Sequence, residues 1–168
     1  EQWRAQRRII DPAFEGGRLR EVMPSMRAAA DATVERIEEG VQEFEELASY
    51  AAADVIFRTL FSIPITHDIA TEVFQEFRIY QRAQPILNIA AFIPLPRWIP
   101  RFHSRATRRS AAHIRNLISE LTRQRADQIA AGTAPDDLAT KIMTTPDPET
   151  GRCFEWREMV DQVEIFFL

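Results

Sequence analysis

An indole and a guanidinium stand one helical turn apart near the start of the chain, at Trp3 and Arg7. Residues four apart on a helix share one face, so the two side chains are expected to project together. Both groups donate hydrogen bonds and neither accepts one. The planar guanidinium also fits a carboxylate through two parallel bonds, so the pair predicts a receptor for an anion. The same spacing also suits a cation–π or packing pair that has no ligand.

Two further arginines, Arg4 and Arg8, repeat the four-residue spacing on a neighbouring face of the same predicted helix. Asp11-Pro12 then ends this helix, because proline lacks an N–H donor and restricts the backbone of the residue before it. The sequence therefore predicts a short helix that presents several cationic side chains.

Outside this helix, the residue types that commonly catalyse reactions or bind metals show no ligand spacing. The three histidines form none of the short motifs that hold a metal ion, and each is interpreted as a surface or interhelical side chain: His67, His103 and His113. Cys153 is the single cysteine, which excludes an internal disulfide and a cysteine-cluster metal site. Because no partner group is placed beside it, a packed thiol is the favoured interpretation.

The elements that position these residues are predicted to be helices throughout, so the predicted fold class is all-α. Apolar residues recur every three or four positions along most of the chain, which is typical of amphipathic helices, and no strand is indicated. Pro24 predicts a short helix followed by a longer one that ends near Gly40. A long helix is expected over residues 102–131, and Thr133-x-x-Asp136 resembles a capping box that opens a short helix.

Residues 86–100 break the helical pattern, because they are apolar and contain Pro94, Pro96 and Pro100. This segment is interpreted as a lid, a membrane-touching patch or a packed connection, and the last is favoured since isolated exposed apolar residues are normal. No run of about 18 apolar residues occurs, so no membrane-spanning helix is expected. The net charge of −4 gives no argument for a nucleic-acid partner.

The length of 168 residues suits one domain, and 45% hydrophobic with 27% charged residues is ordinary for a globular protein. The chain starts inside a helical pattern and stops in the apolar run 165–168 without a capping signal. We therefore expect residues 1–168 to form one incomplete helical domain of a longer protein. Lys141 is the only lysine among 21 basic residues, a bias that suggests a bacterial source, and a cytoplasmic location is expected.

The first residues resemble the C helix of the cytochrome P-450 family, since Trp3-x-x-x-Arg7-Arg8 is followed by Pro12-Ala13-Phe14. Later segments are similar to elements of that family in the same order. Residues 53–61 resemble its E helix, residues 92–98 its F–G loop, and residues 147–168 the approach to its I helix. The resemblance covers essentially the whole chain and implies a partial fold that runs from the C helix to the start of the I helix.

The resemblance implies that Trp3 and Arg7 donate hydrogen bonds to a propionate of haem b. It places Arg4 and Arg8 toward a surface that docks an electron donor of the ferredoxin or flavoprotein type, with two solvated arginines as the alternative. The implied parent is a haem-thiolate monooxygenase, an oxidoreductase that uses O2 and two electrons to oxidise an apolar small molecule.

By the same resemblance, Ile165 and Leu168 border the substrate pocket and Phe92 belongs to its roof, with core packing of the first two as the alternative. The family's cysteine loop for iron is absent from these residues, and Cys153 has none of that loop's context. In this class the cysteine thiolate on the iron favours O–O cleavage. Because these residues lack that cysteine loop, the chain alone is expected to be inactive. The competing interpretation is a non-enzymatic helical ligand-binding or interaction domain, such as the effector domain of a regulator.

Overall fold

The computed structural model describes residues 2–14, 17–82 and 105–165 of the chain. Every regular element within these residues is a helix, which confirms the predicted all-α class, and none of these helices is long and apolar enough to cross a membrane. The segment 86–100, which includes Phe92, lies outside the described residues, as does Leu168. The elements are α1 (Gln2–Ile10), η1 (Asp11–Phe14), α2 (Arg18–Val34), α3 (Phe44–Phe61), α4 (Asp68–Arg82), α6 (Arg105–Ala130), α7 (Leu138–Thr144) and α8 (Trp156–Ile165).

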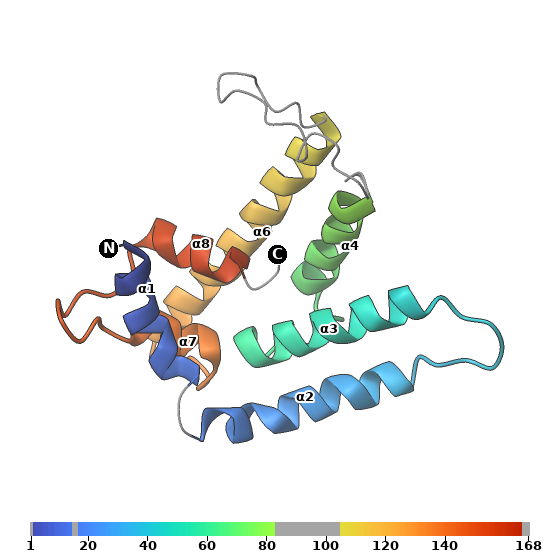
Figure 1. Cartoon of the computed structure of the whole chain (residues 1–168), viewed down its shortest axis with the longest axis horizontal. Coiled ribbons are helices and arrows are strands. Elements are labelled where there is room, and N and C mark those ends of the chain that lie inside the picture. The colour runs from blue at the N-terminus through green and yellow to red at the C-terminus, as the bar shows by residue number, and fades with distance from the viewer. Residues whose placement is uncertain (1, 15–16, 83–104, 166–168) are drawn as a thin grey trace.

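The helices pack mainly in pairs (Figure 1). α2 and α3 lie side by side along one edge of the molecule, and α4 and α6 form a second pair in another direction. α8 lies against α6 near the middle, and α1, η1 and α7 gather at the end where α2 begins. The first described helix is thereby brought close to the start of the last one.

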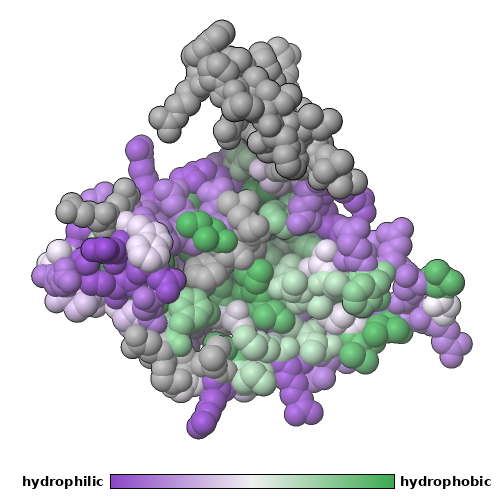
Figure 2. All heavy atoms as spheres, viewed as in Figure 1, coloured by the Kyte–Doolittle hydropathy of each residue, from purple (hydrophilic) through white to green (hydrophobic). Residues whose placement is uncertain are grey.

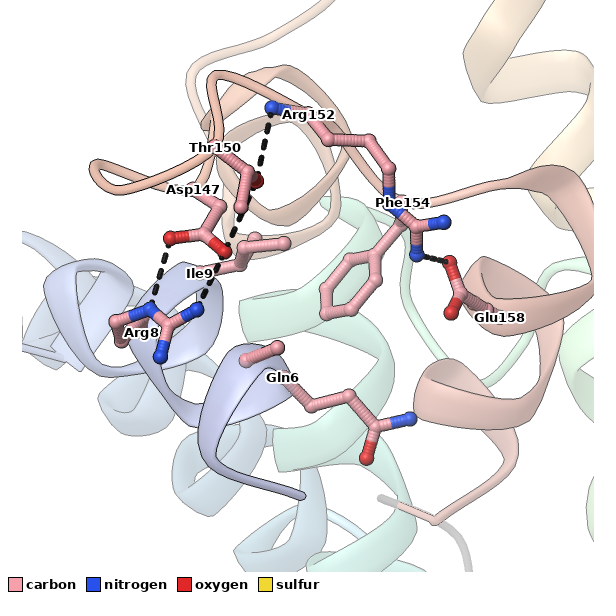
Figure 3. A pocket seen from close by; sticks show the side chains of 9 residues that line it. Gln6, Arg8, Ile9, Asp147, Thr150, Arg152, Phe154 and Glu158 are labelled. Atoms are coloured by element: carbon pink, nitrogen blue, oxygen red, sulfur yellow. Dashed lines mark hydrogen bonds and ion pairs between the residues drawn. The ribbon is translucent and has the colours of Figure 1, made fainter. Parts of the chain in front are cut away.

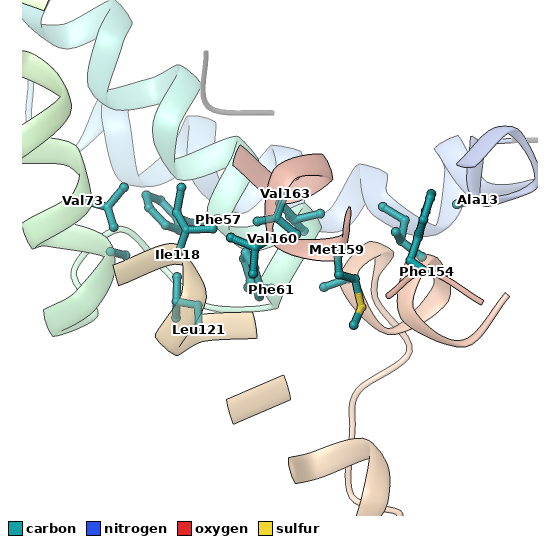
Figure 4. Close-up of a cluster of buried hydrophobic side chains, with 14 of the residues drawn as sticks. Ala13, Phe57, Phe61, Val73, Ile118, Leu121, Phe154, Met159, Val160 and Val163 are labelled. Atoms are coloured by element: carbon teal, nitrogen blue, oxygen red, sulfur yellow. The ribbon is translucent and has the colours of Figure 1, made fainter. Parts of the chain in front are cut away.

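The apolar core lies where α3, α4, α6 and α8 meet (Figure 4). Phe57 of α3 and Ile118 of α6 are fully buried, and Val163 of α8 is 1% exposed. On α6, Ile114, Ile118 and Leu121 follow the helical period and are all buried, as the apolar pattern predicts. Figure 2 shows apolar residues across the middle of one face of the molecule and hydrophilic residues toward its margins.

The ends of two helices test the predicted boundary signals. α1 ends at Ile10, immediately before Asp11-Pro12, as predicted, and a short 3-10 turn continues to Phe14. The predicted capping box at Thr133-x-x-Asp136 is wrong. Asp137 caps α7 instead, because its extended backbone lets a carboxylate oxygen accept the N–H of Thr140 at 3.0 Å.

α2 differs from its prediction in two ways. It is a single helix that runs through Pro24, so the predicted division into a short and a long helix is wrong. A proline inside a helix removes one N–H donor, but the packing of α2 along α3 supplies tertiary contacts that keep the helix continuous. α2 also ends at Val34 rather than near Gly40, and the apolar residues Ile37 and Val41 beyond its end are exposed.

A buried ion pair joins α6 to the start of α7. A guanidinium nitrogen of Arg125 lies 2.8 Å from a carboxylate oxygen of Asp137, and both side chains are almost fully buried. Arg125 also donates to the carbonyl of Phe61 at 2.7 Å, which ties the end of α3 to the same pair. Ser62 follows with a φ of 57°, and its hydroxyl donates to Asp137 at 2.9 Å.

Candidate functional site

The outward face of α1 carries the predicted anion-binding pair. The Arg7 guanidinium carbon lies 6.0 Å from the centre of the Trp3 ring, so the two side chains share a face as their spacing predicts. Trp3 is 69% exposed and the Arg7 side chain 53%. An indole N–H and a guanidinium are therefore both accessible on one side of α1.

Arg7 also forms an ion pair within the same stretch of chain. One of its terminal nitrogens lies 2.7 Å from a carboxylate oxygen of Asp11. A guanidinium has five N–H donors, so this contact leaves donors for a second anion. Among the described residues, the indole nitrogen of Trp3 has no hydrogen-bond partner. The donor set of this face thus fits a carboxylate group such as a haem propionate.

The inward face of α1 is held by a different arginine (Figure 3). The Nε and one Nη atom of Arg8 each donate to a different carboxylate oxygen of Asp147 at 2.8 Å. Glu149 adds a second anion, with a carboxylate oxygen 3.2 Å from the other Nη atom. Next to Arg8, Ile9 and Ile10 are buried. The resemblance places Arg8 toward an electron-donor surface, with a solvated arginine as the alternative, and in the structure its guanidinium binds Asp147 and Glu149.

Asp147 lies in a tight turn between α7 and α8 and is 3% exposed. Its carboxylate also accepts the N–H of Glu149 at 3.0 Å and the hydroxyl of Thr150 at 3.1 Å. Gly151 allows the chain to reverse, because its φ of 68° is a left-handed conformation that glycine adopts without a steric penalty. The Arg8 guanidinium, together with the Glu149 N–H, holds the pKa of the Asp147 carboxyl well below its usual range.

A cavity of about 370 Å³ opens between α1, this turn and the start of α8. Its charged groups are paired with one another. Arg8 binds Asp147, and Arg152 lies 2.6 Å from Glu158. This pairing leaves no unbalanced charge to attract a ligand. The cavity is lined by Ala5, Gln6, Arg8, Ile9, Asp147, Thr150, Arg152, Phe154 and Glu158.

The remaining predicted site residues do not line this cavity. Arg4 is exposed on α1, and it has no ion pair with any residue that the structure describes. Ile165 is 60% exposed at the end of α8. Cys153 is exposed in the segment just after the turn, so the prediction of a packed thiol is wrong. Within residues 2–14, 17–82 and 105–165, no group of three or more histidine, cysteine, aspartate or glutamate residues is placed to hold a metal ion.

The sequence did not reveal the partner of Arg8. Residues 146–151 are rich in the residue types that form turns, and the structure has a turn there. The contact of its buried aspartate with α1 joins residues 139 positions apart. The available signal was Asp147 followed by Glu149 and Gly151. This pattern indicates a turn and gives no sign of an ion pair with α1.

The chain belongs to the cytochrome P450 family. The family model described as Cytochrome P450 matches residues 1–168, which is the whole chain. This match confirms the resemblance that the residues around Trp3 and Arg7 carry. It does not favour the alternative of a non-enzymatic regulator domain.

Curated relatives are oxygenases by name. The chain is 31% identical over 163 residues to pentalenene oxygenase of Streptomyces avermitilis, a match that covers 95% of this chain and 34% of the relative. It is 27% identical over 174 residues to cyclooctat-9-en-7-ol 5-monooxygenase of Streptomyces melanosporofaciens, covering 100% of this chain and 36% of the relative. The chain therefore spans about a third of the length of the relatives that it matches.

Solved structures show the same fold. The haem domain of cytochrome P450DA superposes with a TM-score of 0.68 at 20% identity, over 95% of this chain and 34% of that chain. Cyanobacterial CYP120A1 with bound retinoic acid superposes with a TM-score of 0.70 at 16% identity, over 98% of this chain and 35% of that chain. The helices from α1 to α8 are thus a portion of the cytochrome P450 fold.

Proposed function

We propose that residues 1–168 form one incomplete helical domain within the haem-binding domain of a monooxygenase, and that Trp3 and Arg7 donate hydrogen bonds to a haem propionate. The observation that carries this proposal is the accessible indole and guanidinium on one face of α1, 6.0 Å apart. An arginine bound to a carboxylate in bidentate fashion fixes both the position and the orientation of its ligand. α1 would thereby hold one edge of the cofactor.

The cofactor in this proposal is haem b, held by hydrogen bonds and packing. Haem, when bound, supplies the redox-active iron that the oxygen chemistry of this class requires. The contribution of this chain is to bind and orient the acidic edge of that group through Trp3 and Arg7. Cys153 is exposed and surrounded by turn residues, and we propose that the iron ligand comes from outside residues 1–168. Residues 1–168 alone would then be inactive.

The proposed reaction is the oxidation of an apolar small molecule with O2 and two electrons. Two relatives support this substrate class, because they are named for the oxygenation of pentalenene and of cyclooctat-9-en-7-ol. Ile165 offers an exposed apolar side chain at the end of α8 and is proposed to line the substrate pocket. Leu168 and Phe92 are proposed for the same pocket on the resemblance alone. A bacterial source is proposed because two relatives come from Streptomyces, and the location proposed for the protein is the cytoplasm.

The electron donor is proposed to be a protein of the ferredoxin or flavoprotein type that docks near α1. Arg4 supports this part of the proposal, because it is exposed and is not paired with any described residue. Attraction between exposed charges speeds encounter and weakens as salt is added. Arg8 supports docking less well, since its guanidinium already binds Asp147 and Glu149.

The direct test is Arg7→Ala in the full-length protein, with Arg4→Ala on the same helix as the matched control. Arg7→Ala removes the predicted charge-assisted contact to the propionate, so haem transfer to excess apomyoglobin should become at least about tenfold faster, which corresponds to about 1.4 kcal/mol. Arg4→Ala should transfer haem at the wild-type rate. An Arg7→Ala protein with wild-type haem content and transfer rate would contradict the proposal.

A further inference from the structure

We infer that Arg8 and Asp147 are positioning residues: their ion pair sets the rotation of α1 so that Trp3 and Arg7 face the ligand. This inference rests on the proposed haem-binding role of that face. In this inference Arg8 orients α1 within the protein, in place of the electron-donor contact that the resemblance implies. The case for it follows from the length of α1, the geometry of the pair and the helical spacing of the three side chains.

α1 has few other contacts that could fix its orientation. It is nine residues long, and an isolated helix of that length is marginal in water. Its buried apolar residues, Ile9 and Ile10, both lie in the last turn. Trp3, Arg4 and Arg7 are exposed, so the first two turns have no comparable apolar anchor among the described residues. Apolar packing is also non-directional, and it restrains rotation about the helix axis weakly.

The ion pair has the directional character that this packing lacks. Both bonds from Arg8 to Asp147 measure 2.8 Å, and they use two different nitrogens and two different oxygens. Such a parallel pair requires the guanidinium and carboxylate planes to align, because each fork fits the other in one orientation. A rotation of α1 would break this alignment before it moved the buried isoleucines far.

The carboxylate partner is itself fixed in place. Asp147 accepts the N–H of Glu149 and the hydroxyl of Thr150, and its own backbone N–H donates to the carbonyl of Arg152 at 2.9 Å. Its side chain is nearly fully buried. Asp147 is therefore a rigid hydrogen-bond acceptor. Because Arg8 binds it, the position of the turn determines how α1 is oriented (Figure 3).

The helical period links this anchor to the ligand-binding face. Successive residues of an α-helix are rotated by about 100°, so Trp3 and Arg7 lie about 40° apart on one side. Arg8 lies about 100° from Arg7 and points into the molecule. Fixing Arg8 against Asp147 therefore fixes the direction in which Trp3 and Arg7 project, although neither of them has a hydrogen bond or ion pair with the turn among the described residues.

The test compares haem transfer to apomyoglobin in full-length Arg8→Lys and Asp147→Asn variants. Lysine keeps the charge but loses the fork, and asparagine keeps the shape of the acceptor but loses its charge. Haem transfer should become about tenfold faster in both variants, and the absorption band of the bound haem should broaden. Arg8→Ala should transfer haem at least as fast as Arg8→Lys.

The matched control is Arg115→Ala, which removes another ion pair between helices. Arg115 bridges Asp161 and Glu164 on α8, and it has no hydrogen bond or ion pair with α1 in the part of the chain that the structure describes. If ion pairs act on haem only through global stability, this variant should speed haem transfer as much as Asp147→Asn does at an equal loss of melting temperature. The inference expects haem transfer by Arg115→Ala to stay within about twofold of wild type, which is under about 0.5 kcal/mol.

The outcomes separate this inference from the proposed function. If Arg7→Ala accelerates haem transfer and Arg8→Lys does not, the positioning role is overturned while the haem-binding role stands. If Arg8→Lys leaves haem transfer unchanged but weakens electron-donor affinity in a salt-dependent way, Arg8 belongs to the docking surface, and the inference is again overturned. If Arg7→Ala itself has no effect, the proposed function is the part that fails. Should Asp147→Asn not fold, Arg8→Lys alone still decides.

Discussion

The centre of the molecule and the junction beside α1 are held together by different forces. In the centre, α3, α6 and α8 meet through apolar side chains, with Phe57 and Ile118 fully buried. At the junction, α1 meets the turn before α8 through the bidentate pair of Arg8 and Asp147. The centre is held by contacts among many apolar side chains, whereas the junction depends on two charged side chains.

This difference indicates a division of roles. Burial of apolar surface is the larger source of stability, but in α1 its two buried residues lie in one turn and define the rotation of the helix less sharply than a directional bond does. A paired guanidinium and carboxylate contribute less to stability, because desolvation offsets much of their attraction, and they define geometry more sharply. The centre should therefore determine whether the protein folds, and the junction should determine where α1 points.

The largest expected effect comes from emptying the centre with Phe57→Ala. Removing a fully buried aromatic ring leaves a cavity, so the free energy of unfolding should fall by about 3–5 kcal/mol. Denaturant unfolding of the full-length protein measures this change. Phe44→Ala, at a side chain that is 82% exposed in the same helix, is the control and should change stability by no more than about 0.5 kcal/mol. Equal losses from the two variants would contradict the assignment of the core.

A smaller effect should appear at the junction as a dependence on acid. In the unfolded chain an aspartate binds a proton near pH 4, about its ordinary pKa, whereas Arg8 keeps the pKa of native Asp147 far lower. Below about pH 4 the unfolded state therefore binds more protons, so the contribution of Asp147 is complete above that pH and falls as acid is added. Wild type should lose more stability than Asp147→Asn between about pH 5 and pH 2. Parallel curves in acid denaturation would contradict the pairing.

The smallest effect is expected from Cys153→Ser, outside both regions. The thiol is exposed, so the free energy of unfolding should change by no more than about 0.5 kcal/mol. The full-length variant should also keep the absorption band of its reduced, CO-bound haem, because the proposed iron ligand lies elsewhere. Loss of that band would show that Cys153 serves the iron after all.

The helices of the centre were largely predictable from the sequence. The spacing of Ile114, Ile118 and Leu121 predicted the buried stripe of α6, because a helix places every third or fourth residue on one side. The prediction of residues 102–131 agrees with the observed Arg105–Ala130 over the described residues. Pro12 correctly predicted the end of α1. These signals are local, and local spacing is what a sequence displays directly.

The junction was predictable only in part, because its central contact is not local. The shared face of Trp3 and Arg7 followed from their spacing, whereas the partner of Arg8 lies 139 residues away. Nothing in the spacing of Arg7 and Arg8 distinguishes the exposed arginine from the anchored one. The end of α2 was missed because apolar residues continue at helical spacing past Val34 in the sequence, whereas Ile37 and Val41 are exposed in the structure.

Ser62 limits which sequences can occupy the end of α3. Its left-handed backbone costs a residue with a side chain about 1–2 kcal/mol. The hydroxyl offsets that strain, because a hydrogen bond to a charged group such as Asp137 contributes about 1.5–3 kcal/mol. Glycine would relax the backbone but leave the carboxylate one donor short, and alanine would keep the strain and also lack the donor. The residue at this position must therefore accept a left-handed backbone and also donate a hydrogen bond to Asp137. Of these three residues, only serine does both.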